Sequence, residues 1–250
     1  MDAGDLVLMT DLKTSYGHLV RIGGGTQTVK GLGVLDFDRL RQHGYGDVYE
    51  IGSLRFRLTR PTLQQALSHL ERKAQIITEK DIPHILFIGD VPNARLVIEG
   101  GIGSGFLTAA VCSVLRPGAR LVTYEIREDF AKLALGNLER LGLRDRCTVK
   151  IGDITKGIEE RDADVVVVDI PNPADCVPAA LAALRAGGVF ISYAPAVNQM
   201  EACVRSMRAA GFSGTTSFET LLRRMVVGDQ GTRPDFEMLG HTGYLTYGYR

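Results

Sequence analysis

Apolar and polar residues alternate along the first 60 residues in the way that is typical of short β-strands. Four stretches, residues 4–11, 14–23, 28–37 and 48–60, place apolar side chains at alternating positions over part of their length. Glycine clusters such as Gly23–Gly25 separate these stretches. The pattern predicts a small barrel-like β-domain over residues 1–60.

The hydrophobic period changes at residue 61. Apolar residues then recur at the spacing of one helix face, namely Leu63, Ala66, Leu67 and Leu70. Pro61 suits a first helical turn, and Thr62 with Gln65 has the spacing of a capping box. We expect residues 61–94 to form a linker helix and a connection.

From residue 95 onward, apolar β-branched runs alternate with helical stretches. The runs lie at residues 95–100, 120–126, 147–153, 163–171 and 187–195, and the helical stretches near 105–115, 128–141, 174–185 and 198–210. This alternation indicates a parallel sheet with helices on both faces, an α/β and Rossmann-like domain over residues 95–250. Residues 215–227 and 243–250 read as a closing antiparallel pair.

Composition and charge limit the classes of function that the chain can have. Apolar residues make up 45% of the chain and charged residues 23%, and 29 Lys and Arg balance 29 Asp and Glu. Nucleic-acid binders usually carry a basic excess, so any RNA contact would depend on a local patch or on an assembly. The four cysteines form no CxxC pair, which predicts core thiols and no metal site. No stretch is apolar for long enough to cross a bilayer, so we expect a cytoplasmic protein without membrane contact.

A glycine-rich turn follows the first strand of the α/β domain. Gly101, Gly103 and Gly105 give GxGxG, with Glu99 directly before them and Ser104 among them. A dinucleotide fold requires GxGxxG, and that pattern fails at Phe106. GxGxG after an acidic residue is instead the pattern of class I methyltransferases, in which the loop binds S-adenosylmethionine.

Acidic residues end the next three strands and strengthen this interpretation. Glu125 is placed to accept the ribose hydroxyls, Asp153 to hold an adenine amino group, and Asp169 to lie beside the sulfonium where an acceptor enters. Each feature has a structural alternative. The glycines would also suit a plain turn, and Asp169 would also suit a cap for a helix near Ala174.

The chain resembles the tRNA (adenine-58-N1) methyltransferase family over nearly its whole length. The matching stretches are TRPT (59–62), QIITEKD (75–81), EGGIGSG (99–105), TYEIR (123–127), GDITKGI (152–158), DIPNP (169–173), SYAPAVNQ (192–199) and GHTGYL (240–245). The resemblance implies methylation of N1 of adenine 58, and of adenine 57 as a possible second target, in the T-loop of tRNA. It also implies a homotetramer, with S-adenosylmethionine as donor and S-adenosylhomocysteine as product.

The resemblance also suggests roles for single residues. It implies that Asp169 and Tyr193 face the target adenine as catalytic residues, although Tyr193 would equally suit a core position, and that Gln75 lines the cofactor pocket. Two departures concern the substrate side: Thr78 and Glu79 replace the tyrosine and proline of YPKD, and Ile102 replaces a threonine. The alternatives are a methyltransferase acting on a small molecule or a protein carboxylate, and a non-catalytic RNA-binding subunit.

Overall fold

The N-terminal part of the protein forms two small antiparallel sheets with a hydrophobic core of their own. The computed structural model describes residues 1–73 and 75–250. The first sheet has the order β2-β1-β6-β5, and the second pairs β3 with β4. The elements are β1 (Leu6–Asp11), β2 (Gly17–Arg21), β3 (Thr26–Val29), β4 (Gly33–Asp36), α1 (Phe37–Leu40), β5 (Val48–Ile51) and β6 (Leu54–Thr59). Val7, Leu35 and Phe56 are among the residues of this core, so the expected small β-region is present.

One short helix in this part was not predicted. Residues 28–37 read as a single strand, but they contain the end of β3, a turn and β4, which pairs antiparallel with β3. β4 ends at Asp36, whose side chain accepts a hydrogen bond from the Arg39 amide and begins α1. Aspartate favours such a cap because it satisfies one of the free amides of a first helical turn. The prediction of strand through Phe37 was therefore wrong.

Two short helices connect the β-region to the main sheet. α2 (Leu63–Ser68) begins with the predicted capping box, in which Thr62 and Gln65 each accept a hydrogen bond from the other's backbone amide. α3 (Ile82–Ile88) lies where only a connection was expected. Apart from His84, its sequence IPHILFI is apolar and shows no period to distinguish a helix from a strand. Pro83 stands in the first turn, where proline is tolerated.

The α/β part is built on a seven-stranded sheet with the order β12-β15-β11-β10-β7-β8-β9. The five strands from β11 to β9 are parallel, while β15 runs antiparallel to β11 and β12. The strands are β7 (Leu96–Gly100), β8 (Arg120–Glu125), β9 (Cys147–Ile151), β10 (Ala163–Val168), β11 (Leu184–Ala194), β12 (Ser213–Glu219) and β15 (Tyr244–Tyr249). The helices are α4 (Phe106–Val114), α5 (Glu128–Leu141), α6 (Pro173–Ala183) and α7 (Val197–Ala209), as the sequence predicted to within two residues.

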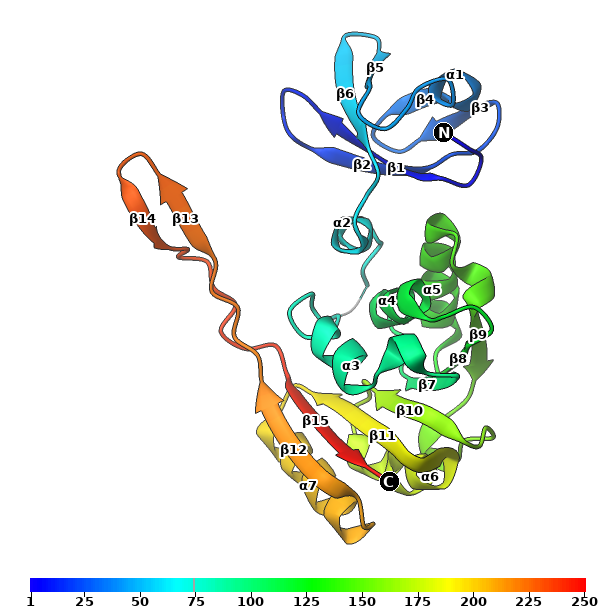
Figure 1. Cartoon of the computed structure of the whole chain (residues 1–250), viewed down its shortest axis with the longest axis vertical. Helices are drawn as coiled ribbons and strands as arrows, with labels where there is room; N and C mark the ends of the chain where they lie inside the picture. Colours follow the sequence, from blue (N-terminus) through cyan, green and yellow to red (C-terminus); the bar gives the residue numbers. More distant parts are fainter. Residues whose placement is uncertain (74) are drawn as a thin grey trace.

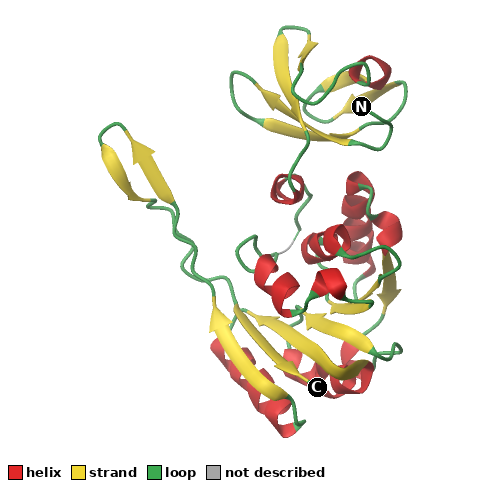
Figure 2. Cartoon of the chain, in the orientation of Figure 1, coloured by secondary structure: helices red, strands yellow, loops and turns green. Residues whose placement is uncertain are grey.

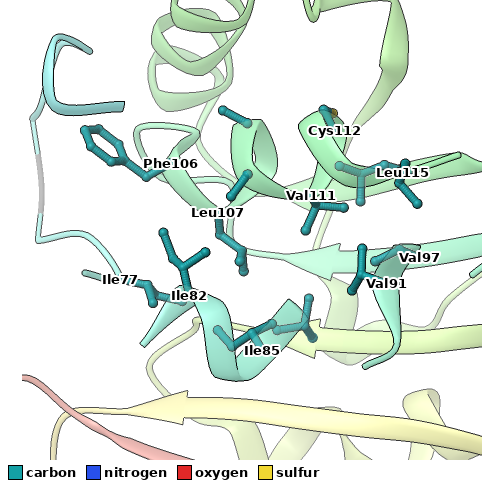
Figure 3. Packing of buried hydrophobic residues seen from close by; sticks show 14 of the residues in the cluster. Ile77, Ile82, Ile85, Val91, Val97, Phe106, Leu107, Val111, Cys112 and Leu115 are labelled. Carbon is teal, nitrogen blue, oxygen red and sulfur yellow. The ribbon is translucent and has the colours of Figure 1, made fainter. Parts of the chain in front are cut away.

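Helices cover both faces of this sheet (Figure 2), and each face has its own core. Successive residues of β10 alternate between the two cores: Val165 and Val167 pack with α2, α3 and α4, whereas Val166 and Val168 pack with α6 and α7. Figure 3 shows the first core, in which Leu107 of α4 faces Ile82 of α3. The expected Rossmann-like sheet with helices on both faces is confirmed. All four cysteines are buried free thiols.

The C-terminal edge departs from the expected simple pair. β12 and β15 do pair antiparallel, but β12 ends at Glu219. The chain then leaves the body, forms a separate hairpin from β13 (Met225–Gly228) and β14 (Gly231–Pro234), and returns to β15 (Figure 1). The interpretation of residues 215–227 as one strand was therefore wrong. No helix in the described part of the chain has the length and hydropathy that a membrane span requires.

Candidate active site

The glycine-rich turn lies at the point where the strand order of the large sheet reverses. After β7 the chain builds β8 and β9 on one side, and it then returns to place β10 on the other side of β7. The carboxyl ends of β7 and β10 are directly hydrogen bonded, because the Asp169 amide donates to Gly100 O over 2.8 Å. Such a switch point leaves a crevice beyond the strand ends, which is where open α/β sheets bind ligands.

Two glycines of the turn are required by its geometry. Gly101 has a φ of +86°, and a Cβ atom there would fall on the backbone oxygen of Asp169. Gly105 has a φ of +80° and would bring a Cβ atom to 3.0 Å from Ala134 Cβ. Gly105 begins α4 without a side-chain cap, so the first amides of this helix are free of side-chain acceptors. Turn and helix together form a cradle that suits a ligand held closely by backbone.

Glu125 lies beside this cradle and is fixed by backbone amides. Its Oε1 accepts a hydrogen bond from the Arg127 amide at 3.0 Å, and its Oε2 accepts a longer one from the Gly103 amide at 3.4 Å. The residue is buried. A carboxylate has about four acceptor positions, so Glu125 keeps the capacity for two more donors, which is what a ribose diol offers.

Glu99 is placed differently from the prediction of a cofactor contact. It is 1% exposed and lies beneath the turn, where its Oε2 accepts a hydrogen bond from Thr108 Oγ1 at 2.8 Å. Burial raises the pKa of Glu99 to about 8, so the residue is protonated at neutral pH. Its Oε1 and the opposite Thr123 Oγ1 both lack a partner among the described residues. A protonated Glu99 is compatible with these two buried groups, because it leaves no buried charge. We therefore infer that Glu99 supports the turn.

Asp169 lies at the end of β10 with an unpaired carboxylate. No described residue donates a hydrogen bond to its side chain, and burial raises its pKa to about 6. The alternative role as a helix cap does not hold, because α6 begins at Pro173 after Asn172 and has no side-chain cap. Asp169 instead lines a small cavity together with Gly101, Gly103 and Ser104. A partly desolvated carboxylate without partners is a group that a positively charged or donor-bearing ligand would satisfy.

Asp153, at the end of the third parallel strand, is exposed and ionised. Its Oδ1 accepts hydrogen bonds from both the amide and the hydroxyl of Thr155, at 2.9 and 2.7 Å. The Thr155 hydroxyl and amide lower the pKa of Asp153. No described residue donates to Oδ2, so this oxygen is available to a ligand.

Tyr193 is 3% exposed and packs against Gly243, where any added Cβ atom would clash with its ring. Burial raises the pKa of Tyr193 to about 12. Its hydroxyl is buried beside Thr242 and Asp81 and makes no hydrogen bond of ordinary geometry with a described residue. The residue therefore contributes its ring to the core, as the structural alternative expected.

Gln75 lines the same small cavity as Asp169 and donates a hydrogen bond from Nε2 to Thr242 O at 3.4 Å. The remaining lining is apolar and comes from Ile76, Ile77, Ile102, Phe106 and Leu107. Ile102 thus supplies a methyl surface where the family often has a hydroxyl. The structure brings together Gln75, the turn and Asp169, whereas Glu99, Glu125, Asp153 and Tyr193 do not line this cavity.

The sequence did not reveal a buried polar cluster around Asp81. Asp81 is 0% exposed and accepts hydrogen bonds from Thr78 Oγ1 at 3.0 Å, Lys80 Nζ at 2.8 Å and Thr242 Oγ1 at 2.9 Å. Thr78 therefore turns inward at the position where the family often has a tyrosine. Asp81 and Thr242 are 161 residues apart in the chain, so no local pattern connects them.

Asn137 is a second residue that the sequence analysis missed. It is 2% exposed, and its Nδ2 donates to Glu71 O and to Ser104 O, both at 2.9 Å. Asn137 thereby joins α5 to the glycine turn and to the segment before it. A signal was available, because Asn137 falls on the apolar face of α5 with Ala134, Leu138 and Leu141.

Comparisons with known proteins agree with this geometry. The family model described as tRNA methyltransferase complex GCD14 subunit matches residues 58–232. A relative from Methanocaldococcus jannaschii, named tRNA (adenine(57)-N(1)/adenine(58)-N(1))-methyltransferase TrmI, is 31% identical over 217 residues, covering 76% of this chain and 77% of the relative. The crystal structure of tRNA (m1A58) methyltransferase TrmI from Aquifex aeolicus superposes with a TM-score of 0.76 and 26% identity, over 100% of this chain and 98% of that chain.

A third similar structure carries a different title. A SAM-dependent O-methyltransferase from Thermotoga maritima superposes with a TM-score of 0.85 and 27% identity, over 100% of this chain and 94% of that chain. The N-terminal β-region is thus shared by proteins with both titles, and it does not by itself discriminate between substrates. The family model and the M. jannaschii relative are both named for the methylation of tRNA. The chain therefore belongs to the tRNA (adenine-58-N1) methyltransferase family within the class I S-adenosylmethionine-dependent methyltransferases.

Proposed function

We propose that this protein transfers a methyl group from S-adenosylmethionine to N1 of adenine 58 in the T-loop of tRNA. The observation that carries the proposal is the switch-point crevice, in which the glycine turn, Gln75 and the unpaired carboxylate of Asp169 line one cavity. Family membership supports the substrate. When bound, S-adenosylmethionine supplies an electrophilic methyl group on a sulfonium.

The residues around the turn suit this cofactor. The amides at the open start of α4, which have no side-chain cap, would face its carboxylate-bearing end. Glu125 would accept the ribose hydroxyls, because both of its oxygens keep unused acceptor positions. Asp153 would accept the adenine amino group at Oδ2. Glu99 supports the turn from below without touching the ligand.

Asp169 would act on the incoming base. N1 of adenine carries a lone pair, so the attack needs no prior removal of a proton. Methylation makes the purine ring cationic, and a carboxylate that accepts a hydrogen bond from N6 stabilises the positive charge as it develops. Asp169 and the apolar lining would hold N1 in line with the methyl group, and water excluded from this lining strengthens the interaction. The base must first be flipped out of its stack.

Methyl transfer with labelled S-adenosylmethionine tests the proposal directly. We expect label in an unmodified tRNA transcript and none in the same transcript with adenine 58 changed to guanine. A second transcript with adenine 57 changed reports whether both adenines are targets. Equal labelling of the intact and the guanine-58 transcripts would contradict the proposed site. Label only in a small molecule or in a protein would favour the O-methyl alternative.

Calorimetric titration separates an enzyme from a non-catalytic subunit. The cradle of Gly101, the amide-fixed Glu125 and the free carboxylate of Asp169 predict that the chain alone binds S-adenosylmethionine. Heat of binding without methyl transfer to tRNA would indicate a missing catalytic partner. A titration without heat would identify a non-catalytic RNA-binding subunit.

The projecting hairpin supports the prediction of a homotetramer. β13 and β14 form a two-stranded sheet that stands away from the body (Figure 1). Val227, Phe236 and Leu239 are 79%, 83% and 65% exposed there. An isolated hairpin is marginally stable, and exposed apolar patches mark contact surfaces. We assign this hairpin to contacts between copies of the chain.

Sedimentation of the pure protein tests the assembly. We expect four subunits for the wild type and smaller species for the double variant Val227→Ser/Phe236→Ser. A wild-type monomer would remove the homotetramer from the proposal. We also propose that residues 1–60 form a small β-barrel-like domain, residues 61–94 a linker helix and connection, and residues 95–250 the methyltransferase domain of a cytoplasmic enzyme.

A further inference from the structure

Arginines line two cavities of the protein, although the chain as a whole has no net charge. A cavity of about 570 Å³ lies at the amino ends of β7 and β8, at the edge of the sheet opposite the crevice. Four arginines line it, namely Arg95, Arg116, Arg120 and Arg161, against a single acid, Asp162. We call it the edge cavity.

A second basic cavity of about 450 Å³ lies where the N-terminal β-region meets the α/β part. Arg21, Arg60 and Arg146 line it, together with Tyr45 and a single acid, Asp5. Arg21 crosses this boundary, because its Nη1 donates a hydrogen bond to Glu139 O at 3.2 Å. We call it the junction cavity.

The two cavities adjoin at the C-terminal end of α4. Ser113 lines the junction cavity, and Arg116, three residues later, lines the edge cavity. Between them, Leu115 O accepts a hydrogen bond from the Arg146 guanidinium. The end of α4 therefore lies between the two cavities.

Several of these arginines have no partner in the part of the chain that the structure describes. The side chains of Arg60, Arg95, Arg116 and Arg120 are exposed and form neither a salt bridge nor a hydrogen bond with any residue in 1–73 or 75–250. Elsewhere on the same sheet, basic groups are paired, as in Lys150 with Glu160 and Arg185 with Asp164. Guanidinium groups without carboxylate partners, gathered in concave surfaces, match the phosphates of a nucleic-acid backbone.

We propose that the edge cavity and the junction cavity form one arginine track that binds the phosphodiester backbone of tRNA. The inference rests on the proposed function, which supplies a polyanionic substrate. Helix α2 lies between the junction cavity and the crevice. Leu63 and Ala66 of α2 line the junction cavity, while Gln64 and Leu67 of the same helix line a third cavity that shares Ile77 with the cofactor site.

Paired double variants test the track. Arg116→Gln/Arg120→Gln removes two charges from the edge cavity. Arg205→Gln/Arg208→Gln removes two exposed charges from α7, one of them paired with Glu201, as a control with the same change in net charge. Affinity for a tRNA transcript is measured at several salt concentrations. For the track variant we expect the slope of log affinity against log salt to fall by about 1.4 to 1.8, at about 0.7 to 0.9 per lost phosphate contact. We expect the control to keep the wild-type slope.

Arg60→Gln removes one charge from the junction cavity. For this variant we expect about half of the change in slope that the edge-cavity double variant shows. In methyl transfer, the track variants should show a raised KM for tRNA with kcat and affinity for S-adenosylmethionine unchanged. Equal slopes for track and control variants, in proteins with wild-type melting temperatures, would overturn the track. So would altered sedimentation with an unchanged slope, which would assign the arginines to subunit contacts. If wild-type protein binds tRNA with the expected slopes but methylates none, the proposed function fails and the track stands.

Discussion

The cofactor side and the acceptor side of the crevice differ in how their polar groups are satisfied. On the cofactor side, Glu125 is held by two backbone amides and Gly101 is locked against Asp169 O. On the acceptor side, the carboxylate of Asp169 has no partner among the described residues. One side is organised before any ligand arrives, and the other keeps polar atoms that a substrate would satisfy.

This difference indicates which features of the protein determine cofactor binding and which determine the choice of methyl acceptor. Backbone geometry fixes the donor site, so that site tolerates few changes of shape. Free side-chain groups define the acceptor site, so changes there should affect rate more than cofactor binding. Both expectations can be broken by experiment.

Gly101→Ala should have the largest effect, because it forces a side chain into left-handed backbone against Asp169 O. Strain of about 1–3 kcal/mol per such residue predicts a loss of S-adenosylmethionine affinity of up to about 10²-fold. Gly103→Ala is the matched control, since its φ is +51° but no atom lies within 4 Å of the added Cβ. We expect that variant to lose about 5- to 30-fold, from the left-handed backbone alone. Equal losses in the two variants, measured by calorimetry, would refute the close-approach argument.

The pH dependence of methyl transfer should follow Asp169. Burial raises the pKa of Asp169 to about 6, so protonation removes its carboxylate as the pH falls through 6. We expect kcat/KM to drop about tenfold per pH unit below this value. A bound sulfonium would favour the carboxylate and shift the same limb of the kcat profile to lower pH. A flat profile between pH 5 and 7 would show that Asp169 has no part in the reaction.

Tyr193→Phe should have a smaller effect, confined to the acceptor side. The hydroxyl has no partner among the described residues, so its removal should leave the melting temperature unchanged. If the hydroxyl contacts the target base, methyl transfer should fall by about 3- to 10-fold, the value of one hydrogen bond of roughly 0.5–1.5 kcal/mol. A melting temperature that falls while the rate holds would assign Tyr193 to the core alone.

Glu99→Gln should affect activity least and should appear in stability. The folded-state pKa of Glu99 is raised from 4.5 to about 8, so the folded protein binds more protons than the unfolded chain between these values. The free energy of unfolding should therefore fall as pH rises from 4.5 to 8, by at most about 1.4 kcal/mol per pH unit from this group. The variant should lack this contribution and keep its affinity for S-adenosylmethionine. Loss of that affinity would place Glu99 in contact with the cofactor.

The parts of the fold that were predicted from sequence are those with local periodicity. Alternating strands and helices between residues 95 and 210 follow from the spacing of apolar residues, and the glycine turn follows from its own pattern. The projecting hairpin and α3 were not predicted, because their apolar residues show no period that distinguishes a helix from a strand. Asp81 and Thr242 meet only through tertiary structure. Glu99 looked like a ligand because sequence shows an acid near glycines but not the burial that protonates it.

Single-turnover methylation of tRNA by Asp169→Asn tests the central claim most directly, with S-adenosylmethionine affinity measured on the same preparation. Asparagine keeps the shape of the side chain but removes the charge that would stabilise the methylated purine. The predicted result is a cofactor affinity within about threefold of wild type and a rate lower by about 10²–10³. A rate close to wild type would contradict the assignment of Asp169 to the acceptor.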